Sequence, residues 1–311
     1  MNVPIAEDIV FNTLSRLTDI DLATLLLIRR FEEALLDLFA NGKVSGTTHT
    51  CLGQEYVPVA LAPLLHGDMV MSNHRGHGHY LAHCADPEGL LAEILGRAGA
   101  PCCGVGGSQH LHRDGFLSTG VQGESVAVAA GAALHAKREG RSQLAVAYIG
   151  DGTWGEGIVY EALNIAQLWS LPLLVVVENN GIAQSTPTAR QMAGSIGDRA
   201  AAFGIDFRRS GSMDILGIRA DIAPLIERMR SLPRPLVLEF DTIRLGPHSK
   251  GDDTRSAADI AALTGRDWCG QYAEAFPAQF AAVDATQRAR VTTIFREVQN
   301  RPLAAWTGSG Q

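Results

Sequence analysis

The stretch from residue 149 to residue 187 reads IGDGTWGEGIVYEALNIAQLWSLPLLVVVENNGIAQSTP. It begins at the end of one apolar run, QLAVAYIG, and contains a second, LPLLVVVEN, with the helical pattern GEGIVYEALNIAQLW between them. Polar residues close both runs: Gly-Asp-Gly at 150–152 and Asn-Asn at 179–180. We therefore predict a strand, a helix and a second strand, with polar residues at the end of each strand.

The same alternation of apolar runs and helical patterns continues beyond this stretch. SIGDRAAAFG and ILGIRADIAPLIERMRSL have helical patterns, while DFRRS and PLVLEFDTIR are typical of strands. Alternation at this spacing predicts a mainly parallel sheet, and the near-continuous apolar strands indicate that both of its faces are buried. The predicted fold class is α/β, doubly wound, with helices on both faces of the sheet.

The N-terminal half carries helical patterns and Gly-rich segments. Residues 20–41, IDLATLLLIRRFEEALLDLFAN, predict an amphipathic helix that ends near Asn41-Gly42. NHRGHGHY (73–80) and CCGVGGSQHLHRDG (102–115) are too rich in glycine and histidine to predict a regular element. Three further helices are expected, over 56–65, 86–99 and 124–140.

The composition limits the classes of protein to which this chain can belong. The chain has 311 residues, 46% of them apolar, and a net charge of −7. We expect a single domain, 1–311, with a helical N-terminal segment at about 1–70 and a variable C-terminal tail whose last residues, TGSGQ, fray. An acidic chain without a Lys/Arg run is a poor candidate for binding nucleic acid or a membrane surface, and no apolar run reaches the ~20 residues that cross a bilayer.

The N-terminal sequence and the cysteines indicate the cellular compartment of the protein. The N-terminus, MNVPIAEDIVFNTL, has no basic region followed by an apolar core, and so does not resemble a signal peptide. No C-x-x-C pair occurs among the five cysteines, which are Cys51, Cys84, Cys102, Cys103 and Cys269. This odd, unpatterned set favours reduced thiols in a cytoplasmic protein.

Ligands of a doubly wound sheet bind beyond the carboxyl ends of its strands. Asp151 and Asn180 both follow such ends, and a single crossover helix lets the two strands lie side by side. A carboxylate, an amide oxygen and a nearby main-chain carbonyl are hard donors that suit Mg²⁺ or Ca²⁺, whose remaining positions commonly go to phosphate and water. Gly150 and Gly152 allow close backbone approach, and the helix beginning near Gly155 offers N–H groups to a phosphate.

A structural interpretation of the same residues competes with this one. Asp-Gly after a strand is often only a turn, and Asn-Asn-Gly is often only a tight loop. Because the two motifs stand at the ends of strands that flank one helix, their combination favours a metal ion that holds a diphosphate.

The spacing of G-D-G and N-N resembles the thiamine diphosphate signature. The chain is similar to the alpha subunit of the E1 component of the pyruvate, branched-chain and acetoin dehydrogenase complexes. The resemblance covers about residues 20–256 and is carried by LLLIRRFEEALLDLFANGKV, HTCLGQE, HRGHGH, GGSQHLH, GDGTWGEG, EALNIAQLW, LPLLVVVENNGIAQSTPT and GPHSKGDDTR. It implies a thiamine diphosphate-binding fold with thiamine diphosphate and Mg²⁺ as cofactors.

The resemblance also implies roles for single residues. Asp151, Asn180 and the main-chain carbonyl of Ile182 match the Mg²⁺ ligands, although the family usually has tyrosine at the last position. Arg75 matches the arginine that binds the diphosphate, for which a guanidinium is well suited. His74 stands where a tyrosine commonly contributes a further phosphate contact.

Gly120 and Gln122 match positions whose main chain holds the aminopyrimidine ring of the cofactor. His49, His77 and His248 match active-site positions, where imidazoles orient substrate, stabilise a developing oxyanion or bind phosphate. A lone histidine is more often a packing or surface residue, and we keep that interpretation for His79, His83, His110 and His112.

Two loops depart from the family. Lysines usually stand where this chain has Cys103 and Val105, and their loss bears on substrate charge or partner docking. Ser108, in the same glycine-rich loop, is expected to shape the wall of the active site without acting as a nucleophile. The segment after His248 is shorter than usual, and its Ser249 stands where some relatives are phosphorylated.

The resemblance implies half of an enzyme. In the family, the glutamate that activates the cofactor belongs to a beta subunit, so we expect an E1 beta-like partner in an α2β2 assembly. The reaction expected is decarboxylation of a small 2-oxo acid, followed by transfer of the acyl group to a lipoyl-bearing E2 partner.

Two alternatives remain open. One is another thiamine diphosphate enzyme, either a split transketolase subunit or an acyloin or acyl-transfer enzyme of a biosynthetic pathway. The other is a regulatory paralogue that keeps the fold without activity, although the presence of Asp151, Asn180 and Arg75 disfavours it. A nicotinamide-dependent dehydrogenase is disfavoured because G-D-G, and no G-x-G-x-x-G, follows QLAVAYIG.

Overall fold

The computed structural model describes residues 14–249 and 253–305. The interpretations made for residues 1–13 of the N-terminus and for the last residues, TGSGQ, lie outside these ranges. Among the described residues, none of the helices combines the length and the apolar character that a bilayer span requires.

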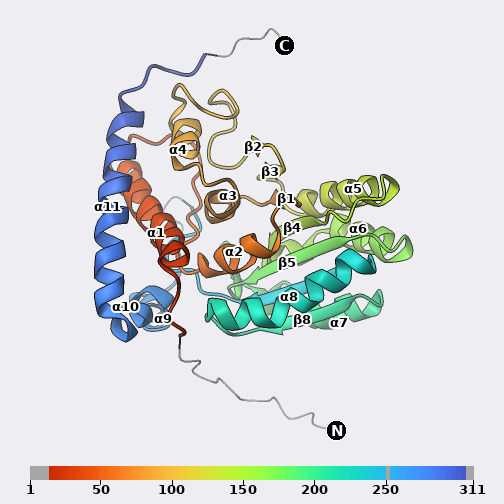
Figure 1. Ribbon diagram of the computed structural model, residues 1–311. Coiled ribbons are helices and arrows are strands. Elements are labelled where there is room, and N and C mark those ends of the chain that lie inside the picture. Colours follow the sequence, from red (N-terminus) through yellow and green to blue (C-terminus); the bar gives the residue numbers. More distant parts are fainter. Residues whose placement is uncertain (1–13, 250–252, 306–311) are drawn as a thin grey trace.

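A seven-stranded sheet forms the centre of the molecule, in the order β2-β3-β1-β4-β5-β9-β8 (Figure 1). Neighbouring strands run parallel except β2 and β3, which are antiparallel. The strands are β1 (Met69–Ser72), β2 (His112–Arg113), β3 (Phe116–Ser118), β4 (Ala145–Gly150), β5 (Leu173–Asn179), β8 (Asp206–Ser210) and β9 (Leu236–Asp241). The predicted mainly parallel α/β fold is confirmed.

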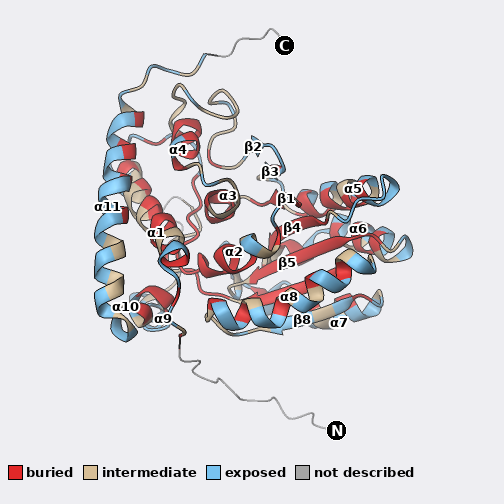
Figure 2. Cartoon of the chain, viewed as in Figure 1, coloured by how far each residue is buried: buried red, intermediate tan, exposed pale blue. Residues whose placement is uncertain are grey.

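Helices cover both faces of the sheet, and alternate residues of each strand point into two separate hydrophobic cores. On β4, Ala147 and Ile149 pack into one core, while Val146 and Tyr148 pack into the other. The first core lies under α5 (Glu124–Arg138), α6 (Gly157–Leu168) and α7 (Ile196–Ala202). The second is covered by α1 (Asp19–Ala40), α2 (Tyr56–Leu61), α3 (His77–Cys84), α4 (Pro87–Leu95) and α8 (Ile215–Ser231). Burial on both faces explains why the central strands are almost wholly apolar (Figure 2).

The C-terminal helices were not predicted from the sequence. Beyond β9 the chain forms α9 (Ala257–Thr264), α10 (Trp268–Ala275) and the long α11 (Pro277–Gln299). Helix α11 packs along α1 at one side of the molecule (Figure 1). Its pattern is weak because its first ten residues include no buried one. The buried residues are Gln287, Val291, Ile294, Phe295 and Val298.

The expectation that residues 73–80 form no regular element is wrong for their second half. The chain is irregular only as far as Gly76, and α3 begins at His77. A Cβ at Gly76 would lie 2.5 Å from Oγ of Ser72, so the glycine lets the turn into α3 pass close to β1. Burial between neighbouring helices stabilises this segment more than its composition disfavours it.

A buried arginine ties together three segments of the helical layer. Arg29 on α1 donates from Nε to Glu55 (2.6 Å) and from its two terminal nitrogens to Asp267 (2.6 and 2.8 Å). Glu55 precedes α2, and Asp267 is the N-cap residue of α10. The carboxylate of Glu55 also accepts hydrogen bonds from the indole of Trp268 and the backbone N–H of Gly53 (both 2.8 Å). The network therefore fixes α1, α2 and α10 relative to one another.

We expect Arg29→Leu to lower the free energy of unfolding by about 3–5 kcal/mol, because it leaves two buried carboxylates without their cation. Arg208→Leu is the matched control, since Arg208 pairs with Asp221 on the surface and should contribute less than about 1 kcal/mol. Urea denaturation followed by circular dichroism measures both. Equal losses for the two variants would contradict the interpretation.

Candidate functional site

The two polar motifs meet at one edge of the sheet. Strands β4 and β5 pair with Gly150 opposite Glu178, so the residues that follow these strands leave the sheet side by side. Asp151 and Asn180 both line a cavity of about 340 Å³ at this edge. The carboxylate of Asp151 accepts hydrogen bonds from the hydroxyl of Thr188 and from the backbone N–H of Asn180. The sequence-based expectation that the two strand ends converge therefore agrees with the geometry.

The carboxyl group of Asp151 is almost completely buried. Burial raises its pKa above the ordinary value, while the hydrogen bonds from Thr188 and the backbone and the charge of Arg244 act in the opposite direction. A buried carboxylate in this state gains from a nearby cation, because the cation compensates for the lost hydration.

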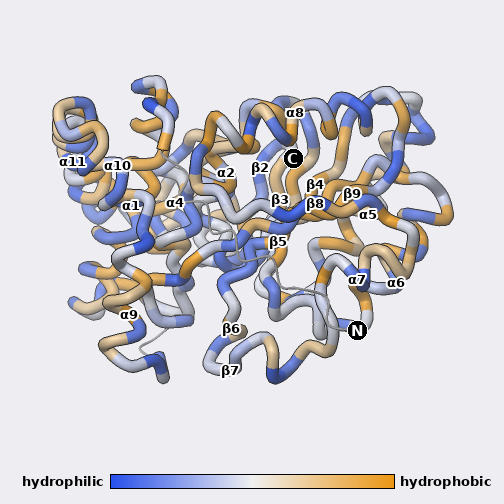
Figure 3. Tube along the Cα trace, turned by 90° about the horizontal axis from the view of Figure 1, so that it is seen from below, coloured by the Kyte–Doolittle hydropathy of each residue, from blue (hydrophilic) through white to orange (hydrophobic). Residues whose placement is uncertain are grey.

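The hairpin β6 (Ile182–Ala183) and β7 (Thr186–Pro187) forms a further wall of the cavity and extends beyond the end of β5 (Figure 3). The Gly-Asp-Gly turn packs tightly against it, since a Cβ at Gly152 would lie 2.6 Å from Cβ of Ala183. The side-chain oxygen of Asn180 accepts the N–H of Ile182 (3.2 Å). Gly152 is therefore required for the contact between the turn and the hairpin.

A chain of buried polar side chains positions Asn180, and the sequence analysis missed it. Asn180 donates to Oε1 of Gln54 (3.0 Å), and Gln54 donates to Oε2 of Glu178 (2.9 Å). The other oxygen of Glu178 contacts Nε2 of His79 (3.2 Å), whose Nδ1 shares a hydrogen bond with Ser72 (2.7 Å). An acidic residue at the end of an otherwise apolar strand was the available signal. His79, expected to be a packing residue, is buried and stacks on Tyr148, and it also takes part in this chain.

Two buried arginines give the cavity a positive wall. Arg75 donates to the main-chain oxygens of Thr50 and His248, and Arg244 donates to that of Gln184 (3.0 Å). Burial lowers the pKa of Arg75, and within the described ranges this guanidinium has no carboxylate in ion-pair contact. A cation bonded only to carbonyl oxygens favours an anionic ligand in the cavity.

Three of the histidines lie against one another beside this wall. The ring centroid of His49 is 4.5 Å from that of His74 and 4.6 Å from that of His248. Nδ1 of His74 contacts the side-chain amide of Gln122 (2.8 Å), whose oxygen accepts the hydroxyl of Thr153 (2.7 Å). Burial, followed by the positive charge of Arg75, holds the pKa of His74 well below its ordinary value.

The model of the family described as "Dehydrogenase E1 component" matches residues 23–274. The chain belongs to this family. It is 39% identical over 230 residues to the alpha subunit of an acetoin:2,6-dichlorophenolindophenol oxidoreductase of Bacillus subtilis, covering 72% of this chain and 69% of the relative. It is 38% identical over 237 residues to the pyruvate dehydrogenase E1 component subunit alpha of Zymomonas mobilis, covering 74% and 67%. The corresponding subunit of Rickettsia prowazekii is 31% identical over 295 residues, 90% of each chain.

These relatives confirm the predicted family and the alpha-subunit type. The dehydrogenase E1 family consists of thiamine diphosphate-dependent oxidoreductases, and an alpha-type chain implies a beta-type partner. Gly150, Asp151, Gly152, Asn180 and Ile182 line the cavity that this E1 chain provides, together with the predicted residues Arg75, His74, Gln122 and His248.

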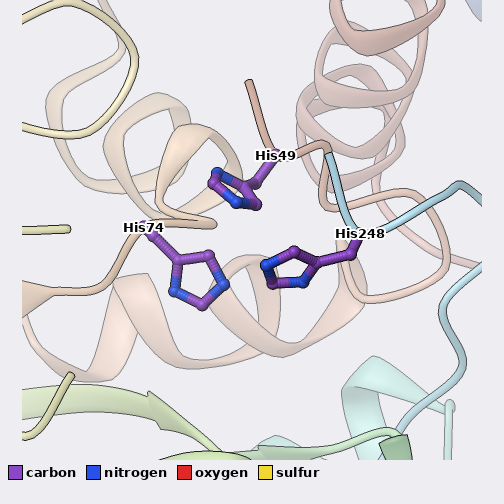
Figure 4. A group of neighbouring side chains, drawn as sticks. All are labelled: His49, His74 and His248. Carbon is purple, nitrogen blue, oxygen red and sulfur yellow. The ribbon is translucent and has the colours of Figure 1, made fainter. Parts of the chain in front are cut away.

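Three of the predicted site residues, His49, His77 and Gly120, do not line the cavity of the E1 chain. His49 is buried beside it, against the rings of His74 and His248 (Figure 4). His77 is fully buried, with Nδ1 3.1 Å from each carboxylate oxygen of Glu32 and Nε2 2.7 Å from the hydroxyl of Ser108. Burial would raise the pKa of Glu32, but His77 and the backbone of Cys51 outweigh it and the pKa is lowered. Gly120 packs against a side chain of the glycine-rich loop, because a Cβ there would lie 2.1 Å from Oε1 of Gln109.

A glutamate carboxylate fixes the glycine-rich loop (102–115) of this chain through hydrogen bonds to its backbone. Glu93 on α4 accepts the backbone N–H groups of Cys102 (2.7 Å), Gly104 (3.2 Å) and Gly106 (2.7 Å). Cys103 adopts a positive φ of 56°, which is unfavourable for a residue with a side chain. The hydrogen bonds to Glu93 stabilise the loop in this conformation. Both cysteines of the loop are free thiols.

We expect Ser108→Ala to lower the free energy of unfolding by about 1–3 kcal/mol, because Nε2 of His77 then loses its partner in a buried position. The exposed residue Ser142 supplies the control, and Ser142→Ala should leave the free energy of unfolding unchanged. Chemical denaturation gives both values. Ser108→Ala with native stability would show that the Glu32–His77–Ser108 chain does not hold the loop.

Proposed function

We propose that this chain is the alpha half of a thiamine diphosphate- and Mg²⁺-dependent 2-oxo acid dehydrogenase. In this proposal the enzyme decarboxylates a small 2-oxo acid and transfers the acyl group to a lipoyl-bearing E2 partner or another acceptor. The observation that carries it is the cavity at the ends of β4 and β5, which Asp151, Asn180 and the buried Arg75 line together.

The donor set supports Mg²⁺ as the bound ion. The carboxylate of Asp151, the amide oxygen of Asn180 and the carbonyl of Ile182 are hard oxygen ligands, and all three residues line one cavity. Mg²⁺ prefers six oxygen ligands, so three protein oxygens leave positions for phosphate oxygens and water. The raised pKa of Asp151 fits a carboxylate that is completed by a cation.

The cationic wall supports a diphosphate as the anion. Arg75 would bind phosphate oxygens through its guanidinium, and Gly150 and Gly152 would let the backbone of the turn approach them. Gly120 and Gln122 keep the proposed role of holding the aminopyrimidine ring through their main chain. His74 lies beside Arg75 and would contribute the contact for which relatives use tyrosine.

Bound thiamine diphosphate would supply a nucleophilic carbon and an electron sink for decarboxylation. The chain's own contribution is to fix the cofactor and to line the reaction space. We propose that His49 and His248 orient the substrate carboxylate and donate a proton to the developing oxygen, as imidazoles can near neutral pH. His77 enters the proposal through its bond to Ser108, which holds the glycine-rich loop at the active site.

A beta-type partner would complete the site, in an α2β2 assembly in the cytoplasm, and would bring the activating glutamate. Helices α5 and α6 pack together and leave apolar side chains exposed, with 71% of Leu168 accessible. The exposed apolar residues of this surface are Val121, Val128, Ile158, Ile165, Leu168 and Trp169. Val121 adjoins Gln122, which lines the cavity, so the apolar surface is continuous with the site.

The identity of the substrate distinguishes the remaining alternative functions from one another. The relatives are named for pyruvate and for acetoin, which both carry a carbonyl next to the carbon–carbon bond that is cleaved. An acyloin or acyl-transfer enzyme or a split transketolase subunit would fit the same cofactor cavity. Decarboxylation assays over 2-oxo acids, acetoin and phosphosugars, with the partner subunit present, distinguish these activities from an inactive paralogue.

We expect Asp151→Ala to abolish Mg²⁺-dependent binding of thiamine diphosphate, because it removes the charged ligand of the ion. Titration calorimetry of the chain together with its partner subunit measures the binding. Asp37→Ala, at an exposed position on α1, is the control and should bind as the native chain does. Undiminished affinity in Asp151→Ala would rule out the metal assignment.

We expect Leu168→Asp to weaken association with the beta-type subunit by at least about tenfold, because a charge replaces an apolar anchor. Leu232→Asp is the control, since Leu232 follows α8 and is also exposed. Co-expression followed by analytical ultracentrifugation measures the fraction of assembled complex. Equal assembly of both variants would mean that α6 does not contact the partner.

A further inference from the structure

Two adjacent cysteines begin the glycine-rich loop, and the proposed function gives a role to neither of them. Cys102 and Cys103 are free thiols and both are partly exposed, whereas Cys51 and Cys269 are buried. Thiols on neighbouring residues can react with each other without any movement of distant parts of the chain. The pair is therefore a candidate site for a redox modification.

We propose that Cys102 and Cys103 form a redox pair, which a peroxide closes to a disulfide and a thiol reductant opens again. The thiolate of one cysteine attacks an oxygen of hydrogen peroxide, the O–O bond breaks, hydroxide leaves and a sulfenic acid remains. The second thiol attacks the sulfenic sulfur, which forms the S–S bond and releases water. Two thiols and one peroxide thus give one disulfide and two molecules of water, so the sulfur atoms are oxidised and the peroxide is reduced.

The surroundings of Cys102 assign the order of the two steps. Burial raises the pKa of its thiol, the backbone N–H of His112 opposes this rise, and the negative charges of Glu93 and Cys103 add to it. A thiol that stays protonated is a poor nucleophile toward peroxide, so Cys103 reacts first and Cys102 resolves the sulfenic acid. The second step is intramolecular, and proximity compensates there for the low reactivity of Cys102.

The adjacency of the two residues makes their disulfide easy to reduce. Neighbouring Cα atoms are about 3.8 Å apart, whereas the Cα atoms that a disulfide joins are usually about 4.4–6.8 Å apart. A bond between adjacent cysteines is therefore strained, and strained or exposed disulfides are the labile ones. The pair returns to the dithiol state once the peroxide is gone, as a reversible switch requires.

Oxidation changes the hydrogen bonds that fix the loop. In the dithiol state, Sγ of Cys102 accepts the backbone N–H of His112 (3.1 Å), which lies near the other end of the loop. The N–H of Cys102 itself donates to the carboxylate of Glu93 (2.7 Å). Formation of the disulfide turns Sγ of Cys102 toward Cys103, so the N–H of His112 loses its acceptor and the two ends of the loop lose a contact.

The loop also contacts two histidines of the proposed active site. The hydroxyl of Ser108 lies 2.7 Å from Nε2 of His77, and the amide of Gln109 lies 3.4 Å from Nδ1 of His49. His49 belongs to the group of three imidazoles shown in Figure 4. A displaced loop would shift both histidines, and small displacements of positioned groups lower the rate of a reaction. This effect on the rate rests on the proposed function, whereas formation of the disulfide does not.

Mass spectrometry of the oxidised chain tests the pair. We would treat the chain, assembled with its partner subunit, with hydrogen peroxide, block the remaining thiols with iodoacetamide and identify the peptide that contains Cys102 and Cys103. We expect this peptide to be unlabelled and lighter by two hydrogen atoms, and to become labelled at both cysteines after treatment with dithiothreitol. Cys84→Ser, which removes a partly exposed thiol at the end of α3, is the matched control and should leave the result unchanged.

Single variants test the order of the two steps. In Cys102→Ser, we expect dimedone to trap a sulfenic acid at Cys103. In Cys103→Ser, a sulfenic acid should form at Cys102 at least about tenfold more slowly, because its raised pKa lowers the fraction of thiolate. Equal rates in the two variants would contradict the assigned order. Labelling of both cysteines after peroxide treatment, or a disulfide from either of them to another cysteine, would overturn the proposal.

Turnover of the assembled enzyme tests whether the pair controls the site. We expect oxidation to lower kcat for decarboxylation by at least about fivefold, and we expect dithiothreitol to restore it. Cys103→Ser should keep its full rate after peroxide treatment, which separates the pair from other targets of the oxidant. Unchanged kcat with a fully formed disulfide would overturn the link to the active site. Absence of decarboxylation by the reduced enzyme would contradict the proposed function, while the mass-spectrometric result would still decide whether the disulfide forms.

Discussion

The functional edge of this molecule depends on the register in which two parallel strands pair. Because β4 and β5 align Gly150 with Glu178, both strands end at the same level, and the residues that follow emerge into one cavity. A shift by one residue would turn every side chain of one strand to the opposite face and would exchange the residues of its two cores. The two cores on β4 are made of different residues, so burial on both faces fixes the register and, with it, the relative positions of Asp151 and Asn180.

The buried chain Ser72–His79–Glu178–Gln54–Asn180 extends this constraint from the backbone to the side chains. A carboxylate in a protein interior is costly unless its oxygens are bonded, and both oxygens of Glu178 have partners. His79, Glu178 and Gln54 are each held from two sides. The amide of Asn180 is held by Gln54 and by the N–H of Ile182, so it has little freedom to rotate. The result is a preorganised oxygen donor at the strand end, which would lower the entropic cost of ordering the proposed metal site.

The sequence was informative wherever local pattern and burial agree. The strand–helix–strand unit at 149–187, the helix ending near Asn41 and the parallel sheet all follow from periodicity and from the polar residues at strand ends. It was uninformative where long-range contacts decide the structure. Helix α3 forms in a segment rich in glycine and histidine because its neighbours bury it, and α11 shows too weak a pattern to be recognised. The position of His77 shows the same limit for the site: its partners Glu32 and Ser108 are 45 residues before it and 31 residues after it, and spacing carries no signal for such a contact.

The part of the fold that carries each side chain of the site explains at which positions this chain can differ from its relatives. The oxygen donors stand at the ends of buried strands, where the register of the sheet and a network of hydrogen bonds leave few alternatives. The histidines stand in loops around the cavity, where a substitution alters the ligand without disturbing a core. His74 stands in such a loop, at a position where the resemblance to the E1 family implies tyrosine, and it lies in a group of three imidazoles next to Arg75. A tyrosine offers a single hydroxyl to a phosphate, whereas a neutral imidazole offers one N–H donor and one nitrogen acceptor. The fold therefore places the proposed oxygen ligands at the ends of buried strands. The loops determine the chemistry of the opposite wall of the cavity.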